Sequence, residues 1–226
     1  MPTVDIVTAT RETSQNFLEK TPLGQSLHRL RFDRRFRLFV QTQNTQALPT
    51  VYNARINAAD AADHLAFIHD DVWVEDCFFI DRILEGLSAN DVIGVAGNRI
   101  RRPLQPAWCF RDEALTPDTV DNLSGRVAHG EAPLGKVELF GKVPSPCELL
   151  DGLFLAAKRS VLVERQVFFD PVFRFHFYDM DFCRTARREG LRLSTWPISL
   201  THRSKGAFGT PAWRQQYRQY LQKWKE

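Results

Sequence analysis

The stretch Leu65-Ala66-Phe67-Ile68-His69-Asp70-Asp71 joins a short apolar run directly to two adjacent acids. The apolar run indicates a buried strand, and the acids then lie where that strand ends. In open α/β sheets, ligands bind at the carboxyl ends of the strands. Neighbouring carboxylates attract a cation, and their oxygens suit Mg²⁺ or Mn²⁺, which often bridge substrate phosphates. The stretch predicts a metal or phosphate site at Asp70 and Asp71; the equally open alternative is that these acids cap the following loop or helix.

Strand-like and helix-like segments alternate on both sides of this stretch. Strands are expected at 4–9, 36–42, 65–68 and 92–96. Helices are expected over 14–30 with a break at Pro22 and Gly24, from Pro49 onward, and over 75–87. This alternation is typical of a mostly parallel sheet with helices on both faces. The sequence therefore predicts an α/β fold in a single domain.

The pattern fades between Gly97 and Pro146, where prolines and glycines recur and no strand is predicted. An interruption of this length inside a compact domain is typical of a functional or accessory insertion. Regular structure is expected again beyond it. The expected segments are a strand within 148–156, two short strands within 191–201, and helices from Ser160, over 179–189 and over 210–224.

The composition indicates a globular protein without a nucleic-acid partner. Of the 226 residues, 43% are hydrophobic and 25% charged, and 30 basic against 27 acidic side chains leave a net charge of only +3. No apolar run approaches the roughly 18 residues of a membrane span, and the N-terminus lacks the pattern of a signal peptide. The four cysteines are widely spaced, which favours reduced thiols. A cytoplasmic location is therefore expected, or one peripheral to the inner face of a membrane.

Five arginines lie between His28 and Arg37. The simplest interpretation is a solvated helix end that leads into an edge strand. The alternative is a surface for an acidic partner or an anionic membrane.

A second candidate site is Phe177-Tyr178-Asp179-Met180-Asp181, which opens an expected helix. Free backbone N–H groups at a helix N-terminus stabilise an ionised carboxylate. Because Asp181 lies about 200° further round the helix than Asp179, the two acids should do different jobs. Asp179 is expected to face a cleft as a base, and Asp181 to pair with the chain or with Arg184 or Arg188. The alternative is that both are ordinary acids of a first helical turn.

Two further segments offer groups for a phosphorylated ligand. In Thr201-His202-Arg203-Ser204-Lys205 an imidazole leaves a predicted strand and is followed by cationic and hydroxyl side chains, although ordinary loop residues are the alternative. Thr8-Ala9-Thr10-Arg11 ends the first strand with hydroxyl and backbone groups that can touch a nucleotide. No G-x-G-x-x-G or Walker pattern is present, which argues against dinucleotide cofactors and P-loop hydrolysis.

The order of the motifs is more specific than any one of them. They are Thr8–Thr10, Leu48–Arg55, Phe67–Asp71, Leu150–Ala156, Phe177–Cys183 and Thr201–His202. This ordered set resembles the family-2-like glycosyltransferases, which have a GT-A fold. The resemblance covers about Thr3 to Gly209, with 97–146 unmatched in detail. It implies a nucleotide-sugar-binding half over 1–96 and an acceptor-side half over 97–226.

The resemblance also implies a nucleotide-sugar donor, usually a UDP-sugar, a glycan or other hydroxyl acceptor, and a divalent metal, Mn²⁺ or Mg²⁺. Asp71 falls on the family's metal-binding acid, and Asp70 would hold the nucleotide or the waters of the metal. His69 stands where the family has the first acid of its Asp-x-Asp motif. Asp179 falls on the general base of the inverting members, and Tyr178 stands where many relatives have Glu.

The remaining implied contacts complete the expected site. His202 falls where some members place a third metal or pyrophosphate contact, and Asp151 lies in the acceptor-side segment. The residues expected to contact the nucleotide-sugar are Thr8, Thr10, Arg11, Asn53, Asp70, Asp151, Arg203 and Lys205.

Two other functions remain open from the sequence. A sugar-phosphate nucleotidyltransferase would use the same acids for Mg²⁺, but such enzymes carry a glycine-rich loop after the first strand, and Thr8–Arg11 contains no glycine. A catalytically inactive module that binds a glycan or a partner protein is the other, and the histidine at 69 and the tyrosine at 178 keep it open.

Overall fold

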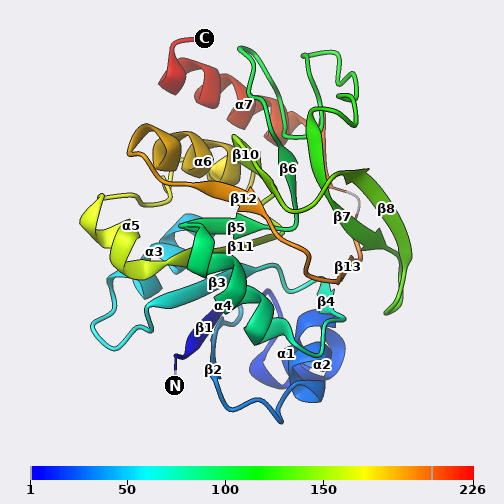
Figure 1. Ribbon diagram of the computed structural model, residues 1–226, viewed down its shortest axis with the longest axis vertical. Coiled ribbons are helices and arrows are strands. Elements are labelled where there is room, and N and C mark those ends of the chain that lie inside the picture. The colour runs from blue at the N-terminus through cyan, green and yellow to red at the C-terminus, as the bar shows by residue number, and fades with distance from the viewer. Residues whose placement is uncertain (1, 205) are drawn as a thin grey trace.

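The computed structural model describes residues 2–204 and 206–226 and contains a central sheet of seven strands (Figure 1). In spatial order the strands are β2 (Phe36–Gln41), β1 (Val4–Ala9), β3 (His64–Ile68), β11 (Phe154–Lys158), β5 (Val92–Gly94), β12 (Leu193–Thr195) and β9 (Ser145–Pro146). β2, β1, β3, β5 and β12 run in one direction, whereas β11 and β9 run antiparallel to their neighbours. The sheet is therefore mixed, with the expected parallel strands forming its larger part.

Strand β11, from the second half of the chain, is inserted between two strands from the first half. It lies between β3 and β5 and pairs antiparallel with both. Its five residues are apolar or aliphatic except for Lys158, and the first four are buried, as a strand with neighbours on both edges requires.

A second sheet combines strands from the segment 97–146 with short strands from elsewhere in the chain. Its order is β10 (Leu149–Leu150), β6 (Ala96–Asn98), β7 (Leu123–His129), β13 (Leu200–His202) and β4 (Val72–Val74), with β8 (Lys136–Gly141) paired to β7. The expectation of an irregular 97–146 is thus wrong in part, because β7, β8 and β9 lie within it. Gly125 inside β7 explains the miss: its φ of 107° and a Cβ position only 2.1 Å from the carbonyl oxygen of Val95 require glycine, which normally signals a break.

Seven helices accompany the sheets in the described part of the chain. They are α1 (Ser14–Lys20), α2 (Pro22–Arg29), α3 (Leu48–Asn57), α4 (Phe79–Ala89), α5 (Arg159–Glu164), α6 (Tyr178–Arg188) and α7 (Pro211–Trp224). The expected break at Pro22 is confirmed, with the Thr21 hydroxyl capping α2 through the Gly24 N–H. Helix α4 begins at Phe79 rather than at Glu75 because Val72–Val74 pairs with β13 instead.

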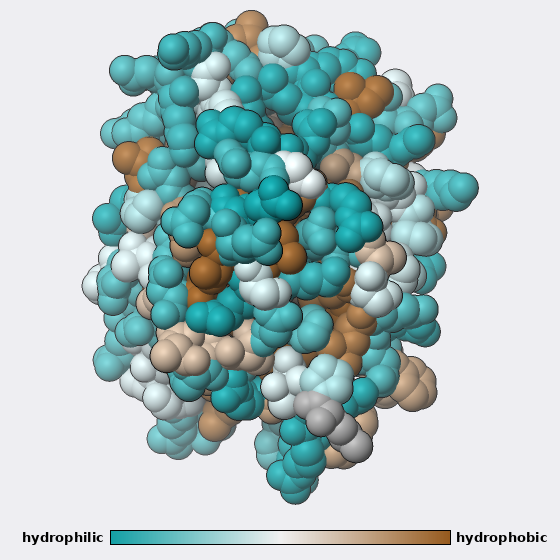
Figure 2. Space-filling model, turned by 60° about the vertical axis from the view of Figure 1, so that its left-hand side comes forward, coloured by the Kyte–Doolittle hydropathy of each residue, from teal (hydrophilic) through white to brown (hydrophobic). Residues whose placement is uncertain are grey.

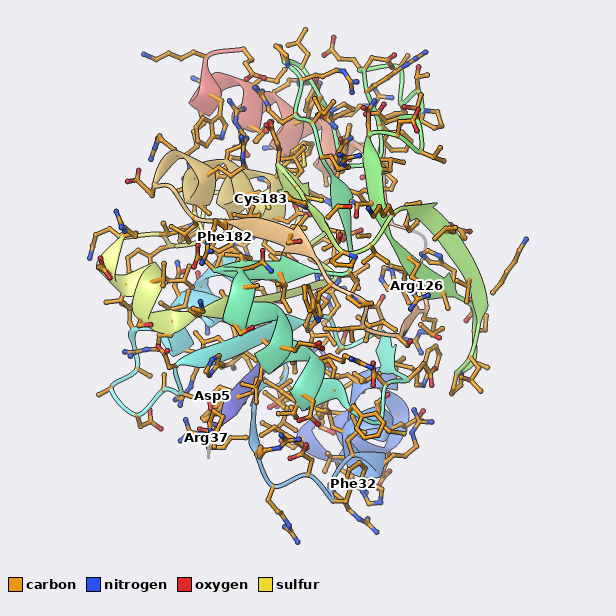
Figure 3. The ribbon with its side chains drawn as sticks, in the orientation of Figure 1. Asp5, Phe32, Arg37, Arg126, Phe182 and Cys183 are labelled. Atoms are coloured by element: carbon orange, nitrogen blue, oxygen red, sulfur yellow. The ribbon has the colours of Figure 1, made fainter. Side chains whose placement is uncertain are left out.

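The arginine-rich segment matches its simpler interpretation, since it joins the end of α2 to the edge strand β2. Arg35 forms ion pairs with Asp33 and Asp81, both at 2.7 Å. Figure 3 shows Asp5 and Arg37 side by side near the N-terminus, where Arg37 Nε lies 2.7 Å from the carboxylate.

Asp5 is a fully buried structural carboxylate near the start of β1. It accepts hydrogen bonds from Arg37 and Arg55 and from the N–H of Ala62. Its charge is therefore used to hold three segments together and is not available to a ligand.

Replacing Asp5 with Asn should lower the free energy of unfolding by about 3–5 kcal/mol, because it leaves the largely buried guanidinium of Arg55 without its counter-charge. Urea unfolding measures this loss. Asp60→Asn is the matched control: Asp60 also pairs with Arg55 but is 69% exposed, so its loss should cost less than about 1 kcal/mol. Equal effects of the two substitutions would contradict a structural role for the buried pair.

Several large hydrophobic side chains are exposed at the surface, among them Leu134, Val137 and Leu139 on and beside β8. The face turned toward the viewer in Figure 2 is mainly hydrophilic, with hydrophobic residues in small separate patches. Phe32, labelled at the lower end of Figure 3, is one exposed example on another part of the surface. Within 2–204 and 206–226, no helix has both the length and the apolar character needed to cross a membrane.

Candidate functional site

A cleft of about 540 Å³ lies where strands of both sheets end. This volume is in the range of pockets that hold small-molecule ligands. The acids and histidines of its lining are His69, Asp70, Asp71, His129, Glu138, Asp151, His176, Asp179 and His202. Aromatic side chains form much of the remaining wall, among them Tyr52, Trp108, Phe140, Phe175, Phe177, Tyr178, Phe208 and Trp213.

Asp71 and His202 meet because of the strand pairing in the second sheet. β13 runs antiparallel to β4 with His202 opposite Val72, and the Arg203 N–H donates to the Asp71 carbonyl at 3.0 Å. His202 Nε2 consequently lies 3.4 Å from Asp71 Oδ2. One ligand atom each from His69, Asp71 and His202 lie within 4.8 Å of one another.

One oxygen of this cluster has no hydrogen-bond partner among the described residues. Asp71 Oδ1 is buried and accepts no hydrogen bond from any residue in 2–204 or 206–226. A buried carboxylate oxygen without a donor is costly unless something else binds it. Two imidazoles and a carboxylate are donors that divalent transition metals accept, so the residues present fit a metal ion.

The electrostatics of the cluster favour an ionised Asp71. Burial alone would raise the pKa of Asp71, but its hydrogen bond with His202 and the charges of His202 and His69 hold that pKa well below its usual value. Burial likewise acts to lower the pKa of His202, yet the contact with Asp71 raises it overall. The pKa of His69 is lowered, and burial is the largest cause.

Asp179 lies at the start of α6 and also lines the cleft. Phe177 precedes the helix with φ 63° and ψ 0°, a left-handed conformation that turns the chain into α6. Asp179 Oδ2 accepts the Gly152 N–H and Oδ1 accepts the Met180 N–H, both at 2.9 Å. A Cβ at Gly152 would lie 2.4 Å from the Tyr178 hydroxyl oxygen and 2.9 Å from Asp179 Cβ, so only glycine permits this approach.

The protonation of Asp179 differs from the expectation for a helix N-terminus. Burial, and then the negative charge of Asp151, raise the pKa of Asp179 to about 7, although the backbone N–H groups act to lower it. The expected stabilisation of the ionised form is therefore present but outweighed. A carboxyl group with a pKa near neutrality is suited to accept or donate a proton during a reaction.

The neighbouring acids have separate tasks. Asp151 accepts a hydrogen bond from Trp108 Nε1 at 2.7 Å and another from the Leu153 N–H. Asp181 points away from the cleft, as expected, but its partners are Lys223 Nζ at 2.8 Å and Trp224 Nε1 at 2.9 Å. The expectation of an arginine partner was wrong, because α7 packs against this side of α6 and supplies the lysine.

Comparison with known proteins identifies the family. A model of the "Glycosyltransferase like family" matches residues 25–205. The chain belongs to this family. The expected resemblance is thereby confirmed.

Solved structures similar to this glycosyltransferase show the same fold at low identity. The catalytic domain of Drosophila β1,4-galactosyltransferase 7 in complex with xylobiose has a TM-score of 0.55 and 11% identity, covering 96% of this chain and 80% of that one. A mutant of the same enzyme with manganese, UDP-Gal and xylobiose matches with a TM-score of 0.55, 10% identity and the same coverage. GalNAc-T7 with UDP, GalNAc and Mn²⁺ gives 0.50 and 11%, covering 92% of this chain and 45% of that one. No curated protein sequence matches the chain.

Only some of the residues that were expected to bind the nucleotide-sugar line the cleft. Asp70 and Asp151 line it, and burial raises the pKa of Asp70. Thr8 and Thr10 are buried at the end of β1; the Thr8 hydroxyl has no partner within the described residues, and the Thr10 hydroxyl accepts the Glu12 N–H. Arg11 is exposed at the surface beside them.

Asn53 does not line the cleft, and the side chain of Arg203 is exposed. Both ends of the Asn53 amide are bound by the backbone of Phe169, at 2.6 and 3.0 Å, so this side chain ties α3 to a loop and does not line the cleft. The Arg203 side chain is exposed, although its backbone contacts Asp71. Lys205 lies outside the described residues.

The segment 97–146 was expected to contact the acceptor, but the sequence identified none of its residues as part of the site. Trp108, His129, Glu138 and Phe140 all line the cleft. Trp108 packs edge-on against Phe140, with ring centroids 4.9 Å apart. Both side chains also belong to the packing of the protein, since Trp108 is part of the hydrophobic core and Phe140 packs against it. The sequence therefore held no signal that separates a cleft wall from a core here.

Proposed function

We propose that this glycosyltransferase transfers a sugar from a nucleotide-sugar donor, a UDP-sugar, to a hydroxyl group of a glycan or other acceptor, with inversion and with a divalent metal, Mn²⁺ or Mg²⁺. The observation that carries the proposal is the content of one cleft. Asp71 and His202 offer metal donors, and Asp179 offers a carboxyl group with a pKa of about 7. The UDP, UDP-Gal and manganese named for the similar structures support it.

The donor would be held near the ends of β1 and β3. Asp71 and His202 would bind the metal, which offsets the negative charge that develops on the departing diphosphate. Asp70, Thr8, Thr10 and Arg11 are the proposed contacts of the nucleotide. Arg203 and Lys205 are the proposed cationic contacts of the diphosphate.

The acceptor would approach from the side of Asp179. An acceptor hydroxyl is a weak nucleophile at neutral pH, and a carboxylate within hydrogen-bond distance can take its proton as the new bond forms. Asp179 is held by two backbone donors and faces the cleft, which fixes its carboxylate for this role. The aromatic wall around Trp108 offers apolar surface to a sugar ring.

The pH dependence of transfer follows from the pKa of Asp179. Since that pKa is raised to about 7, the carboxyl group is protonated below it, and kcat/KM should rise with pH and level off above about 7. Asp151→Asn removes the neighbouring negative charge and should move the midpoint to lower pH. A pH profile of kcat/KM for both proteins tests this. An unchanged midpoint in the variant would show that another group controls the profile.

A thermal-shift panel of UDP, UDP-sugars and other nucleotide sugars, with and without Mn²⁺, tests the function itself. A bound donor raises the melting temperature by mass action, so a UDP-sugar with Mn²⁺ should give the largest shift, and metal-dependent donor hydrolysis should accompany it. Release of pyrophosphate from a nucleoside triphosphate and a sugar 1-phosphate would instead indicate a nucleotidyltransferase. Binding of glycans without any nucleotide would indicate an inactive module.

A further inference from the structure

His69 is held by a hydrogen bond that decides which of its nitrogens carries the proton. Its Nε2 lies 2.8 Å from the Tyr178 hydroxyl oxygen. The same hydroxyl lies 2.7 Å from the carbonyl oxygen of Gly152. A carbonyl oxygen can only accept, so the single hydroxyl proton of Tyr178 goes to Gly152. The Tyr178 oxygen must then accept the proton of His69 Nε2.

This assignment leaves Nδ1 as the nitrogen of His69 with a lone pair. A neutral imidazole has one donor and one acceptor nitrogen, and the donor is Nε2 here. His69 stacks on Phe175, with ring centroids 5.7 Å apart and an interplanar angle of 23°, which adds to the constraint on its ring. Tyr178 is itself buried, so its hydroxyl is fixed between its two partners. His69 thus presents an oriented, unprotonated nitrogen.

The third observation is the cluster around Asp71. His69, Asp71 and His202 each offer a ligand atom within 4.8 Å of the others, and Asp71 Oδ1 is buried without a donor in the described part of the chain. In metalloproteins, a ligating histidine commonly donates its other N–H to a protein oxygen, which fixes its tautomer. The Tyr178 oxygen occupies that position for His69.

We propose that His69 Nδ1 is a third protein ligand of the metal, beside Asp71 and His202, and that Tyr178 is the positioning residue that fixes its tautomer. This inference rests on the metal site of the proposed function. Two imidazole nitrogens and one carboxylate form a set that favours Mn²⁺, Co²⁺ or Zn²⁺, whereas Mg²⁺ prefers oxygen ligands. The site therefore selects a transition metal over Mg²⁺.

Direct metal binding to the intact protein tests the ligand. Calorimetry with Mn²⁺ and with Mg²⁺ should show tighter binding of Mn²⁺, and pulsed electron paramagnetic resonance of bound Mn²⁺ should detect two imidazole nitrogens. In His69→Gln, the side-chain amide can still donate a hydrogen bond to Tyr178. It has no nitrogen at the place of Nδ1 that could bind the metal. The substitution should leave one imidazole nitrogen and weaken Mn²⁺ binding by about 10–100-fold, with a smaller effect on Mg²⁺.

Tyr178→Phe tests the positioning role, because it removes only the hydroxyl from a buried ring. Mn²⁺ binding should weaken by about 10-fold or more, with the second nitrogen coupling lost or altered. Tyr217→Phe is the matched control, since its hydroxyl also donates to a carbonyl, that of Leu104 at 2.6 Å, but contacts no histidine. Thermal melts without metal check that both variants fold, and the control should bind Mn²⁺ like the original protein.

The outcomes separate this inference from the proposed function. If His69→Gln and Tyr178→Phe bind Mn²⁺ with unchanged affinity and unchanged nitrogen couplings while Asp71→Asn does not bind it, His69 is not a ligand and the proposed function stands. If Asp71→Asn also binds Mn²⁺ normally, the metal site of the proposed function is itself misplaced. Mg²⁺ binding as tight as Mn²⁺ binding would overturn the selectivity.

Discussion

Asp179→Asn should lower the rate of sugar transfer by a factor of about 10²–10⁴, the usual contribution of a general base. Asparagine has nearly the same shape and can still accept the Gly152 or the Met180 N–H, but it cannot take a proton from the acceptor. Donor affinity should change little, because the proposed base acts on the acceptor hydroxyl and not on the donor. Initial rates with a fixed donor and a varied acceptor measure the loss, and a calorimetric titration with UDP and Mn²⁺ checks the donor.

Asp181→Asn is the control on the same helix. Asp181 pairs with Lys223 and Trp224 away from the cleft, so its loss should reduce stability more than turnover of the folded protein. Asp179→Asn should have the opposite effect on stability. A carboxyl group whose folded-state pKa is raised from 3.8 to about 7 makes the fold less stable as pH rises through that window, and asparagine removes this penalty. Full transfer by Asp179→Asn would place the base elsewhere.

Asp71→Ala should abolish Mn²⁺-dependent binding of UDP. The substitution removes the only charged donor among the three clustered metal donors, so affinity should fall by on the order of 10²-fold or more, beyond the 10–100-fold typical of groups that merely support a ligand. Calorimetry with UDP at fixed Mn²⁺, and again with a chelator, measures the metal-dependent part.

Glu85→Ala is the control for this variant. Glu85 is an exposed acid on α4 that pairs with Arg82, so both metal and UDP binding should remain. A melt without metal shows whether Asp71→Ala is folded. Unchanged metal dependence in a folded Asp71→Ala protein would remove Asp71 from the site.

The parallel part of the fold was predictable because its signals are local. β1, β3 and β5 are short apolar runs, β2 has apolar residues at alternate positions, and the helices α1, α2 and α3 have threonine or proline at their starts. The second sheet was not predictable, because its strands are held by partners far away in the sequence. β4 has only three residues and pairs with β13, about 130 positions later, and β8 is largely exposed, so that its alternating Val137 and Leu139 do not mark a core face.

The sequence predicted several of the acids that line the cleft, but it did not predict their pKa values or their contacts. Asp71 and Asp179 stand at a strand end and a helix start, which sequence patterns reveal. The pKa of Asp179 depends on how deeply α6 is buried and on Asp151, which comes from another segment. The contact of His69 with Tyr178 likewise depends on tertiary packing between residues 109 positions apart.

The place of β11 in the central sheet has a consequence for synthesis of the protein. β5 pairs only with β11 and β12 among the described strands, and both are made later. Between residues 94 and 158 the growing chain therefore carries unpaired edges on β3 and β5. At about 5–20 residues per second, this state lasts roughly 3–13 seconds. Exposed strand edges invite pairing with other chains, so the nascent enzyme should depend on ribosome-bound chaperones, and 1–96 cannot be exchanged between relatives as an independent module.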